Sequence, residues 1–105
     1  MYSVLFSCRM DIRDNPPLER LLISFQQHTS PIERHFSEFL IKFDSDDKGI
    51  PDDDFFDQFD FKIKRFVWDR HSGRSSLHEA QNTLLNYVSD HCKFLQVIAD
   101  DFIFT

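Results

Sequence analysis

A pair of carboxylates near the end of the chain has the chemistry that is easiest to read from the sequence. Asp100 and Asp101 interrupt an otherwise apolar stretch at residues 94–104. Burying charges in such a stretch is costly unless a metal ion or a basic group compensates them. Adjacent oxygen ligands suit a hard divalent cation such as Mg²⁺ or Mn²⁺, commonly together with phosphate oxygens. The pair therefore predicts a divalent-metal site.

A second group of acidic residues follows the apolar run at residues 39–43. Residues 44–60 hold eight aspartates and one lysine, a net charge of −7, so the rest of the chain carries +1 of the total of −6. This balance argues against a protein that binds nucleic-acid backbones generically. Two interpretations of the segment stay open: solvated caps and turns, or an acidic interaction or inhibitor module that mimics nucleic acid.

Four short apolar runs and two amphipathic segments must position these residues in a chain whose 105 residues suffice for one domain. The runs at residues 2–8, 39–43, 61–68 and 94–99 predict strands. The third alternates apolar and basic residues, as an edge strand does, and the last is expected to be buried. The Phe-rich segment at residues 55–59 is interpreted as a plug for the core beneath the acidic loop.

The two amphipathic segments predict helices with recognisable starts. The first follows Asp14-Asn15-Pro16-Pro17, repeats apolar residues at helical spacing, and ends or is interrupted at Ser30-Pro31. The second starts at the capping box Ser76-Leu77-His78-Glu79 and continues to about Asp90. The apolar stripe of the first helix consists of Leu18, Leu21, Leu22 and Phe25, and that of the second of Leu77, Ala80, Leu84 and Val88.

This order of elements, β-α-β-β-α-β with the acidic loop after the second strand, predicts the fold class. We expect a single α/β unit over residues 1–105, with a Rossmann-like, mostly parallel sheet of about four strands and flanking helices. Ligands of such sheets lie beyond the carboxyl ends of the strands. The residues that the four strands deliver to that edge are Ser7, Cys8 and Arg9; Asp44, Asp46 and Asp47; Asp69 and Arg70; and Asp100 and Asp101.

The chain resembles the nucleotide-sugar-binding half of a GT-A-fold glycosyltransferase of the family 2 type. The matching pieces span essentially the whole chain in the expected order, and their order and spacing carry the resemblance more than any single motif. They are Ser3-Val4-Leu5-Phe6-Ser7-Cys8-Arg9, Pro17-Leu18-Glu19-Arg20-Leu21-Leu22-Ile23-Ser24-Phe25, Phe39-Leu40-Ile41-Lys42-Phe43-Asp44-Ser45-Asp46-Asp47, Gly73-Arg74 with Leu77-His78-Glu79 and Asn82, and Val97-Ile98-Ala99-Asp100-Asp101.

The resemblance implies a role for each matching residue. Asp101 would hold Mn²⁺ or Mg²⁺ on the donor diphosphate, and Asp100 would contact the same metal, the ribose or a basic neighbour. Literal D-x-D spacing is absent, because Phe102 and Ile103 follow this pair. The implied nucleotide-binding set, for a uridine or guanosine diphosphate sugar, is Ser7, Arg9, Asp44, Asp46, Arg74 and Asp100.

The activity implied is transfer of the sugar to an acceptor hydroxyl, in which the metal neutralises the departing diphosphate. An inverting reaction also needs a carboxylate base. In the family this base follows the metal motif, so it is expected beyond Thr105, in a chain that resembles a truncated domain. We also expect a cytoplasmic protein without a signal peptide or membrane span. Because later parts of such a domain would normally cover the last strand, its edge, Phe102 and Phe104 are expected to be exposed and to mediate self-association.

Other metal and signalling sites were weighed against this one. An EF-hand loop beginning at Asp44 would place Lys48 and Phe55 where oxygen ligands are needed. The histidine pairs His28/His35 and His71/His78 lack the spacing of zinc ligands. A receiver-like signalling domain would use Asp69 as its phosphoacceptor. Finally, Cys8 and Cys92 are expected at opposite ends of parallel strands, beyond disulfide reach.

Overall fold

The apolar runs form a four-stranded, all-parallel sheet, which confirms the predicted α/β, Rossmann-like fold class. A computed structural model describes residues 1–8, 17–45, 49–68, 76–98 and 104. The strand order is β3-β2-β1-β4, so the chain builds outward from β1 on one side and then crosses to its other side. The strands are β1 (Tyr2–Cys8), β2 (Ser37–Asp44), β3 (Lys62–Trp68) and β4 (Phe94–Ile98).

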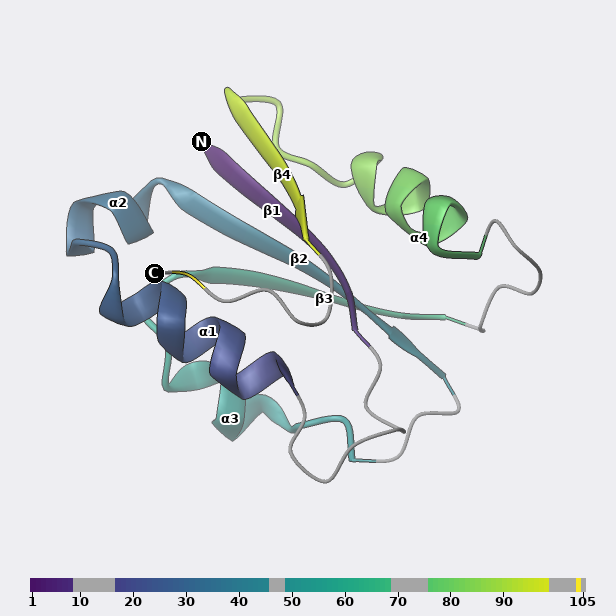
Figure 1. The fold of residues 1–105 in the computed structure, drawn as a ribbon, viewed down its shortest axis with the longest axis horizontal. Helices are drawn as coiled ribbons and strands as arrows, with labels where there is room; N and C mark the ends of the chain where they lie inside the picture. Colours follow the sequence, from purple (N-terminus) through teal and green to yellow (C-terminus); the bar gives the residue numbers. More distant parts are fainter. Residues whose placement is uncertain (9–16, 46–48, 69–75, 99–103, 105) are drawn as a thin grey trace.

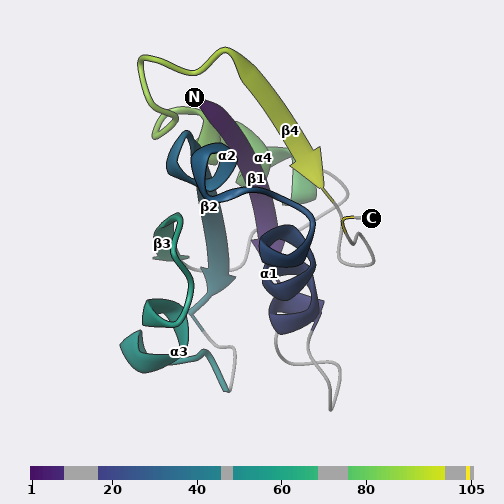
Figure 2. The ribbon, with the colours of Figure 1, turned by 90° about the vertical axis from the view of Figure 1, so that its left-hand side faces the viewer.

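Helices cover both faces of this sheet (Figure 1). Helix α1 (Pro17–Gln27) and the short helix α3 (Asp53–Asp57) lie on one face, and α4 (Ser76–Leu85) packs against β1 and β2 on the other. A view turned by 90° looks onto the sheet and shows the strands in the order β3, β2, β1, β4, with α1 in front of the sheet and α4 behind it (Figure 2). The predicted stripe of α1 is buried in full, because its four apolar side chains recur on the side facing the sheet.

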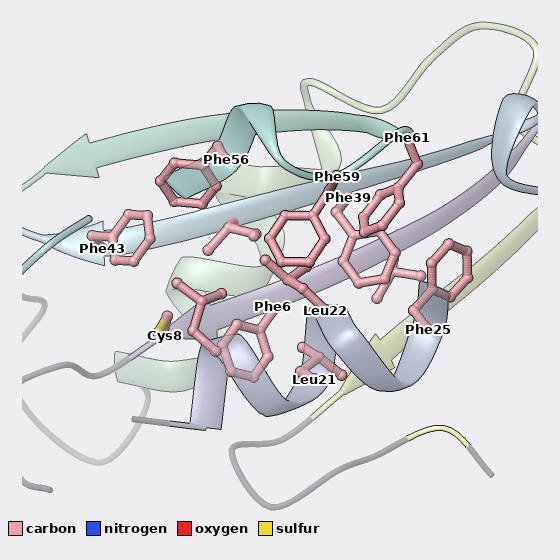
Figure 3. Close-up of a cluster of buried hydrophobic side chains, with 13 residues drawn as sticks. Phe6, Cys8, Leu21, Leu22, Phe25, Phe39, Phe43, Phe56, Phe59 and Phe61 are labelled. Atoms are coloured by element: carbon pink, nitrogen blue, oxygen red, sulfur yellow. The ribbon is translucent and has the colours of Figure 1, made fainter. Parts of the chain in front are cut away.

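Aromatic rings fill the space between the sheet and α1 and α3 (Figure 3). The Phe25 ring meets those of Phe39 and Phe61 edge-on, with centroids 4.8 and 4.9 Å apart. Phe56 and Phe59, in and just after α3, are buried in the same cluster, which confirms the predicted aromatic plug. Edge-to-face pairs of this kind add specificity to the burial of apolar area.

The opposite face has a much smaller apolar cluster and carries more polar groups. Leu5, Leu40 and Leu84 form its buried centre, with Phe66 and Trp68 packed beside them. Side chains at alternate positions of β1 and β2 point to this face, so the register of the two strands decides which polar residues share it.

One local prediction is confirmed and others need correction. The first helix is interrupted before Ser30-Pro31 as expected, and a second helix, α2 (Pro31–His35), starts there because Ser30 and Glu33 form a reciprocal capping box. Helix α4 ends at Leu85 instead of Asp90, where tighter turns replace helical bonding: the N–H groups of Asn86 and Tyr87 donate to carbonyls three residues back.

The last strand also differs from the prediction of a buried strand. β4 is an edge strand, and its Phe94, Leu95 and Val97 side chains are exposed. Phe104, expected to be exposed, is half-buried against Phe25, and its N–H donates to Ser24 Oγ at 2.9 Å. Phe102 lies outside the described residues.

Two further expectations concern cysteines and membrane spans. Cys8 and Cys92 are both thiols, not a disulfide, as the placement of the strands predicted. Within the described ranges, no helix is long and apolar enough to cross a membrane.

Candidate functional site

The strand order creates a reversal point between β1 and β4, which is the place where the connections from neighbouring strands run in opposite directions across the sheet. From β1 the chain proceeds through α1 to β2, on one side, and later returns through α4 to β4, on the other. In open parallel sheets, the crevice beyond the carboxyl ends at such a reversal is the usual ligand site. The predicted site residues Ser7 and Asp44 lie at this edge, on neighbouring strands. Arg9, Asp46, Arg74, Asp100 and Asp101 lie outside the described residues.

Asp44 is the last residue of β2 and forms a buried ion pair with Lys42. The Lys42 ammonium donates a hydrogen bond to Asp44 Oδ1. The two residues are only 2% and 5% exposed, so each charge compensates the cost of burying the other. The pair orients the Asp44 carboxylate at the end of the sheet where the strands have their carboxyl ends, called the carboxyl edge below. Lys42 is a functional candidate that the sequence reasoning did not single out.

Two further groups share the face of this ion pair. Trp68 lies opposite Asp44 in the strand register, and Lys42 Nζ is 5.5 Å from the centre of its indole ring. Ser7 lies opposite Lys42 on β1. The Ser45 N–H donates to the Trp68 carbonyl at 3.0 Å and so continues the pairing of β2 with β3 past the end of the strands. The edge therefore presents a carboxylate, an ammonium, a hydroxyl and an aromatic ring together.

A signal for Lys42 was present in the sequence. Lys42 stands inside the apolar run at residues 39–43 and two positions before Asp44, hence on the same side of a strand. A basic residue within a run that is otherwise apolar is costly to bury without a partner. The alternation of a strand then names Asp44 as the nearest acidic partner.

A second buried carboxylate lies toward the amino ends of the strands on the same face. Glu38 is fully buried; its Oε1 accepts from Ser3 Oγ at 2.7 Å and from the Ser89 N–H at 2.9 Å, and its Oε2 is 3.1 Å from Lys64 Nζ. Burial raises the pKa of Glu38, but these hydrogen bonds and the Lys64 charge outweigh it and hold the pKa below its ordinary value. Two of these contacts join Glu38 to the neighbouring strands β1 and β3, and the third ties the segment after α4 to the sheet, so we assign Glu38 a structural role.

Three of the described aspartates of the acidic segment have internal partners. Asp52 caps α3 by accepting from the Phe55 N–H at 3.3 Å. Asp53 pairs with Arg65 at 2.7 Å and Asp60 with Arg34 at 2.5 Å. Contacts of this kind are what the interpretation as solvated caps and turns expects. A strand, not a helix, precedes Asp44, so the entering helix of an EF-hand is absent from the described residues before it.

A cavity of about 550 Å³ lies at the opposite edge of the sheet. Its walls are mainly aromatic and include Tyr2, Phe25, Phe36, Phe94 and Phe104. The described site residues Ser7 and Asp44 do not line it, since it opens at the amino ends of the strands. The carboxyl edge and this cavity are therefore separate features.

A metal site is not formed by the residues whose positions are known. Among them, no three histidine, cysteine or acidic side chains gather closely enough to hold an ion. The ligands implied by the resemblance, Asp100 and Asp101, belong to the undescribed part of the chain. Metal binding by this pair thus stays a prediction from the sequence.

Comparisons with protein-family models, with curated proteins and with solved structures returned no match for the chain. The case for its function therefore rests on the strand order, on the groups at the carboxyl edge and on the sequence motifs.

Proposed function

We propose that the carboxyl edge binds a nucleoside diphosphate sugar through a divalent metal, as the donor-binding part of a glycosyltransferase. The observation that carries this proposal is the reversal point between β1 and β4, with Asp44 held by Lys42 at the end of the neighbouring strand β2. Such a reversal favours ligand binding beyond the carboxyl ends of these strands.

Each group at the edge has a chemical use in this proposal. In this proposal the Asp44 carboxylate accepts a hydrogen bond from an N–H of the nucleobase, while the buried Lys42 ammonium holds that carboxylate in place. Uracil and guanine both present a ring N–H, so both fit this acceptor. Trp68 offers an aromatic surface beside them, and Ser7 a hydroxyl on the adjacent strand.

The diphosphate end of the ligand would be bound by the residues that the resemblance implies. Asp101, with Asp100, would hold Mn²⁺ or Mg²⁺, and Arg9 and Arg74 would supply positive charge near the phosphates. Bound there, the metal supplies Lewis-acid stabilisation of the leaving diphosphate. Transfer to an acceptor hydroxyl further needs a general base, for which the described residues offer no assignment.

The test uses the single tryptophan of the chain as a reporter at the proposed site. UDP and GDP are titrated separately, with and without MnCl₂, while Trp68 fluorescence and the heat of binding are recorded. We expect saturable binding of one of the two nucleotides that requires Mn²⁺, and its loss in Asp101→Ala. Asp57→Ala, which removes an exposed carboxylate of α3, is the matched control and should bind as the parent does.

The contradicting result is equally definite. If calorimetry detects no Mn²⁺-dependent binding of UDP or GDP by the folded chain, the proposed function is wrong. An acidic inhibitor module would instead bind a basic protein, and charge reversal at Asp52 to Asp54 would weaken that complex. The internal partners of Asp52 and Asp53 favour the nucleotide proposal over this alternative.

A further inference from the structure

The two outer strands of the sheet, β3 and β4, differ in how their free sides are protected from pairing with a strand of another molecule. β3 carries Lys62, Lys64 and Arg65 along its seven residues. β4, with the sequence Phe-Leu-Gln-Val-Ile, carries no charged residue. Charged side chains, lysine above all, are the usual means by which a sheet edge avoids recruiting a second strand. The β3 edge has this protection and the β4 edge lacks it.

Three side chains of β4, those of Phe94, Leu95 and Val97, are exposed, and they lie on both faces of the sheet. Leu95 and Val97, paired in register with Ser3 and Leu5, point to the α4 face and are 46% and 45% exposed. They are uncovered because α4 packs on β1 and β2 (Figure 2). On the other face, Phe94 is 69% exposed at the mouth of the aromatic cavity. In the described part of the chain, no strand pairs with the outer side of β4.

We propose that this outer side pairs antiparallel with β4 of a second copy of the chain, giving one continuous sheet across two molecules. Another strand is the kind of partner that pairs with a whole row of backbone N–H and C=O groups at such an edge. A two-fold axis through Gln96 places Leu95 of each copy opposite Val97 of the other, so all four exposed side chains meet in two cross-strand pairs.

The charged residues before and after β4 also favour antiparallel pairing of this strand with the same strand of a second copy. Lys93 precedes β4, and the acidic pair Asp100-Asp101 follows it after Ala99. An antiparallel arrangement runs the amino end of one strand along the carboxyl end of the other. A basic residue before the strand and acidic residues after it therefore favour this arrangement over a parallel one, in which like charges meet. The inference does not depend on the proposed nucleotide site.

The test compares two exposed valines, one on each edge strand, of which Val97 lies on the α4 face and Val67 on the α1 face. Val97 of β4 and Val67 of β3 are 45% and 55% exposed, so lysine is accommodated at either position at similar cost to the fold. Sedimentation equilibrium of the 105-residue chain over a wide concentration range should show a monomer–dimer equilibrium. Val97→Lys should raise the dissociation constant by about tenfold or more, because two ammonium groups replace apolar side chains in the interface, while Val67→Lys should leave it unchanged.

A second measurement requires no variant. Amide hydrogen exchange of the parent chain should become slower in residues 94–98 at high concentration than at low concentration, with no matching change in residues 62–68. A monomer at all concentrations overturns the proposal. So does a dimer that Val67→Lys weakens as much as Val97→Lys, or one whose formation leaves exchange in residues 94–98 unchanged.

Discussion

Replacing Glu38 by glutamine tests how a buried charge fixes the α4 layer to the sheet. The amide oxygen of glutamine can still accept from Ser3 and Ser89, so the two hydrogen bonds to Oε1 are retained. The second carboxylate oxygen becomes an NH₂ group that faces the Lys64 ammonium, which is 3.1 Å from Oε2 in the parent protein. The substitution thus removes one charge of a buried pair and leaves the shape of the side chain almost unchanged.

The expected cost follows from the burial of the two partners. Breaking a buried ion pair by removing one partner costs about 3–5 kcal/mol, and less where water screens the pair. Glu38 is fully buried but the Lys64 side chain is 26% exposed, which places the loss at the lower end of this range. We expect about 3 kcal/mol at pH 7, a large part of the roughly 5–15 kcal/mol that stabilises a typical domain.

The loss should depend on pH with a sign that the pKa determines. The folded protein holds the pKa of Glu38 below its ordinary value of 4.5, because hydrogen bonds and the Lys64 charge outweigh burial. A carboxyl with a lowered pKa contributes stability that is fully present above the unfolded-state pKa and is lost as the pH falls through the folded-state pKa. The difference between parent and Glu38→Gln should therefore be constant from pH 7 to about 5 and shrink at lower pH.

Urea unfolding at a series of pH values measures this difference. With a slope of about 1–3 kcal/mol per M, a loss of 3 kcal/mol lowers the midpoint by about 1–3 M at pH 7. Asp57→Asn is the control, since it removes the same charge from an exposed position and should leave the midpoint nearly unchanged. A loss for Glu38→Gln that equals that of the control, or that stays the same from pH 7 to pH 3.5, would refute the assignment of Glu38 as a charged partner of Lys64.

Two further substitutions probe the packing and the chain turn before β2. Phe25→Ala should destabilise the fold by about 3–5 kcal/mol, because the ring is buried among other phenylalanines. Phe36→Ala is the control: its ring is exposed, so the substitution should cost less than about 1 kcal/mol. Thermal unfolding measures both. Ser30→Ala removes the hydroxyl that caps α2, while Thr29 and all other residues stay the same. The free energy of unfolding, measured with urea, should fall by about 1 kcal/mol. An unaffected unfolding midpoint in Ser30→Ala would contradict the capping box.

Local patterns in the sequence were sufficient for the four strands, the two longer helices and the sheet class, but not for the short helices α2 and α3. The helical stripe of α1 and the apolar runs of the four strands depend on neighbours within one segment, and each was found where predicted. The end of α4 and the exposure of β4 depend instead on what packs beside them. The sequence pattern of residues 94–99 is that of a buried strand, and only the strand order β3-β2-β1-β4 shows that it lies at an edge.

The candidate site was predicted in part. The rule that parallel strands end at one edge correctly brought Ser7 and Asp44 together on neighbouring strands. It did not anticipate the buried pair of Lys42 with Asp44, because it considers only residues at the ends of strands, whereas Lys42 lies within β2 and is related to Asp44 by the alternation of the strand. Glu38 was missed for a stronger reason: its partners Lys64 and Ser89 come from distant parts of the sequence, and no local spacing relates them to it.

The two faces of the sheet are stabilised in different ways, one mainly by apolar burial and the other also by polar contacts. This difference relates the fold to the proposed site. Rings fill the α1 face, so apolar burial stabilises it. The α4 face has a small apolar centre between two buried carboxylates: Glu38 binds the chain after α4 near the amino ends of the strands, and Asp44 is held at the carboxyl ends. The Glu38 contacts are directional, so its hydrogen bond to Ser89 fixes the segment after α4 with less apolar area than α1 uses. The same face carries Ser7, Lys42, Asp44 and Trp68 toward the carboxyl ends of the strands, where the nucleotide site is proposed.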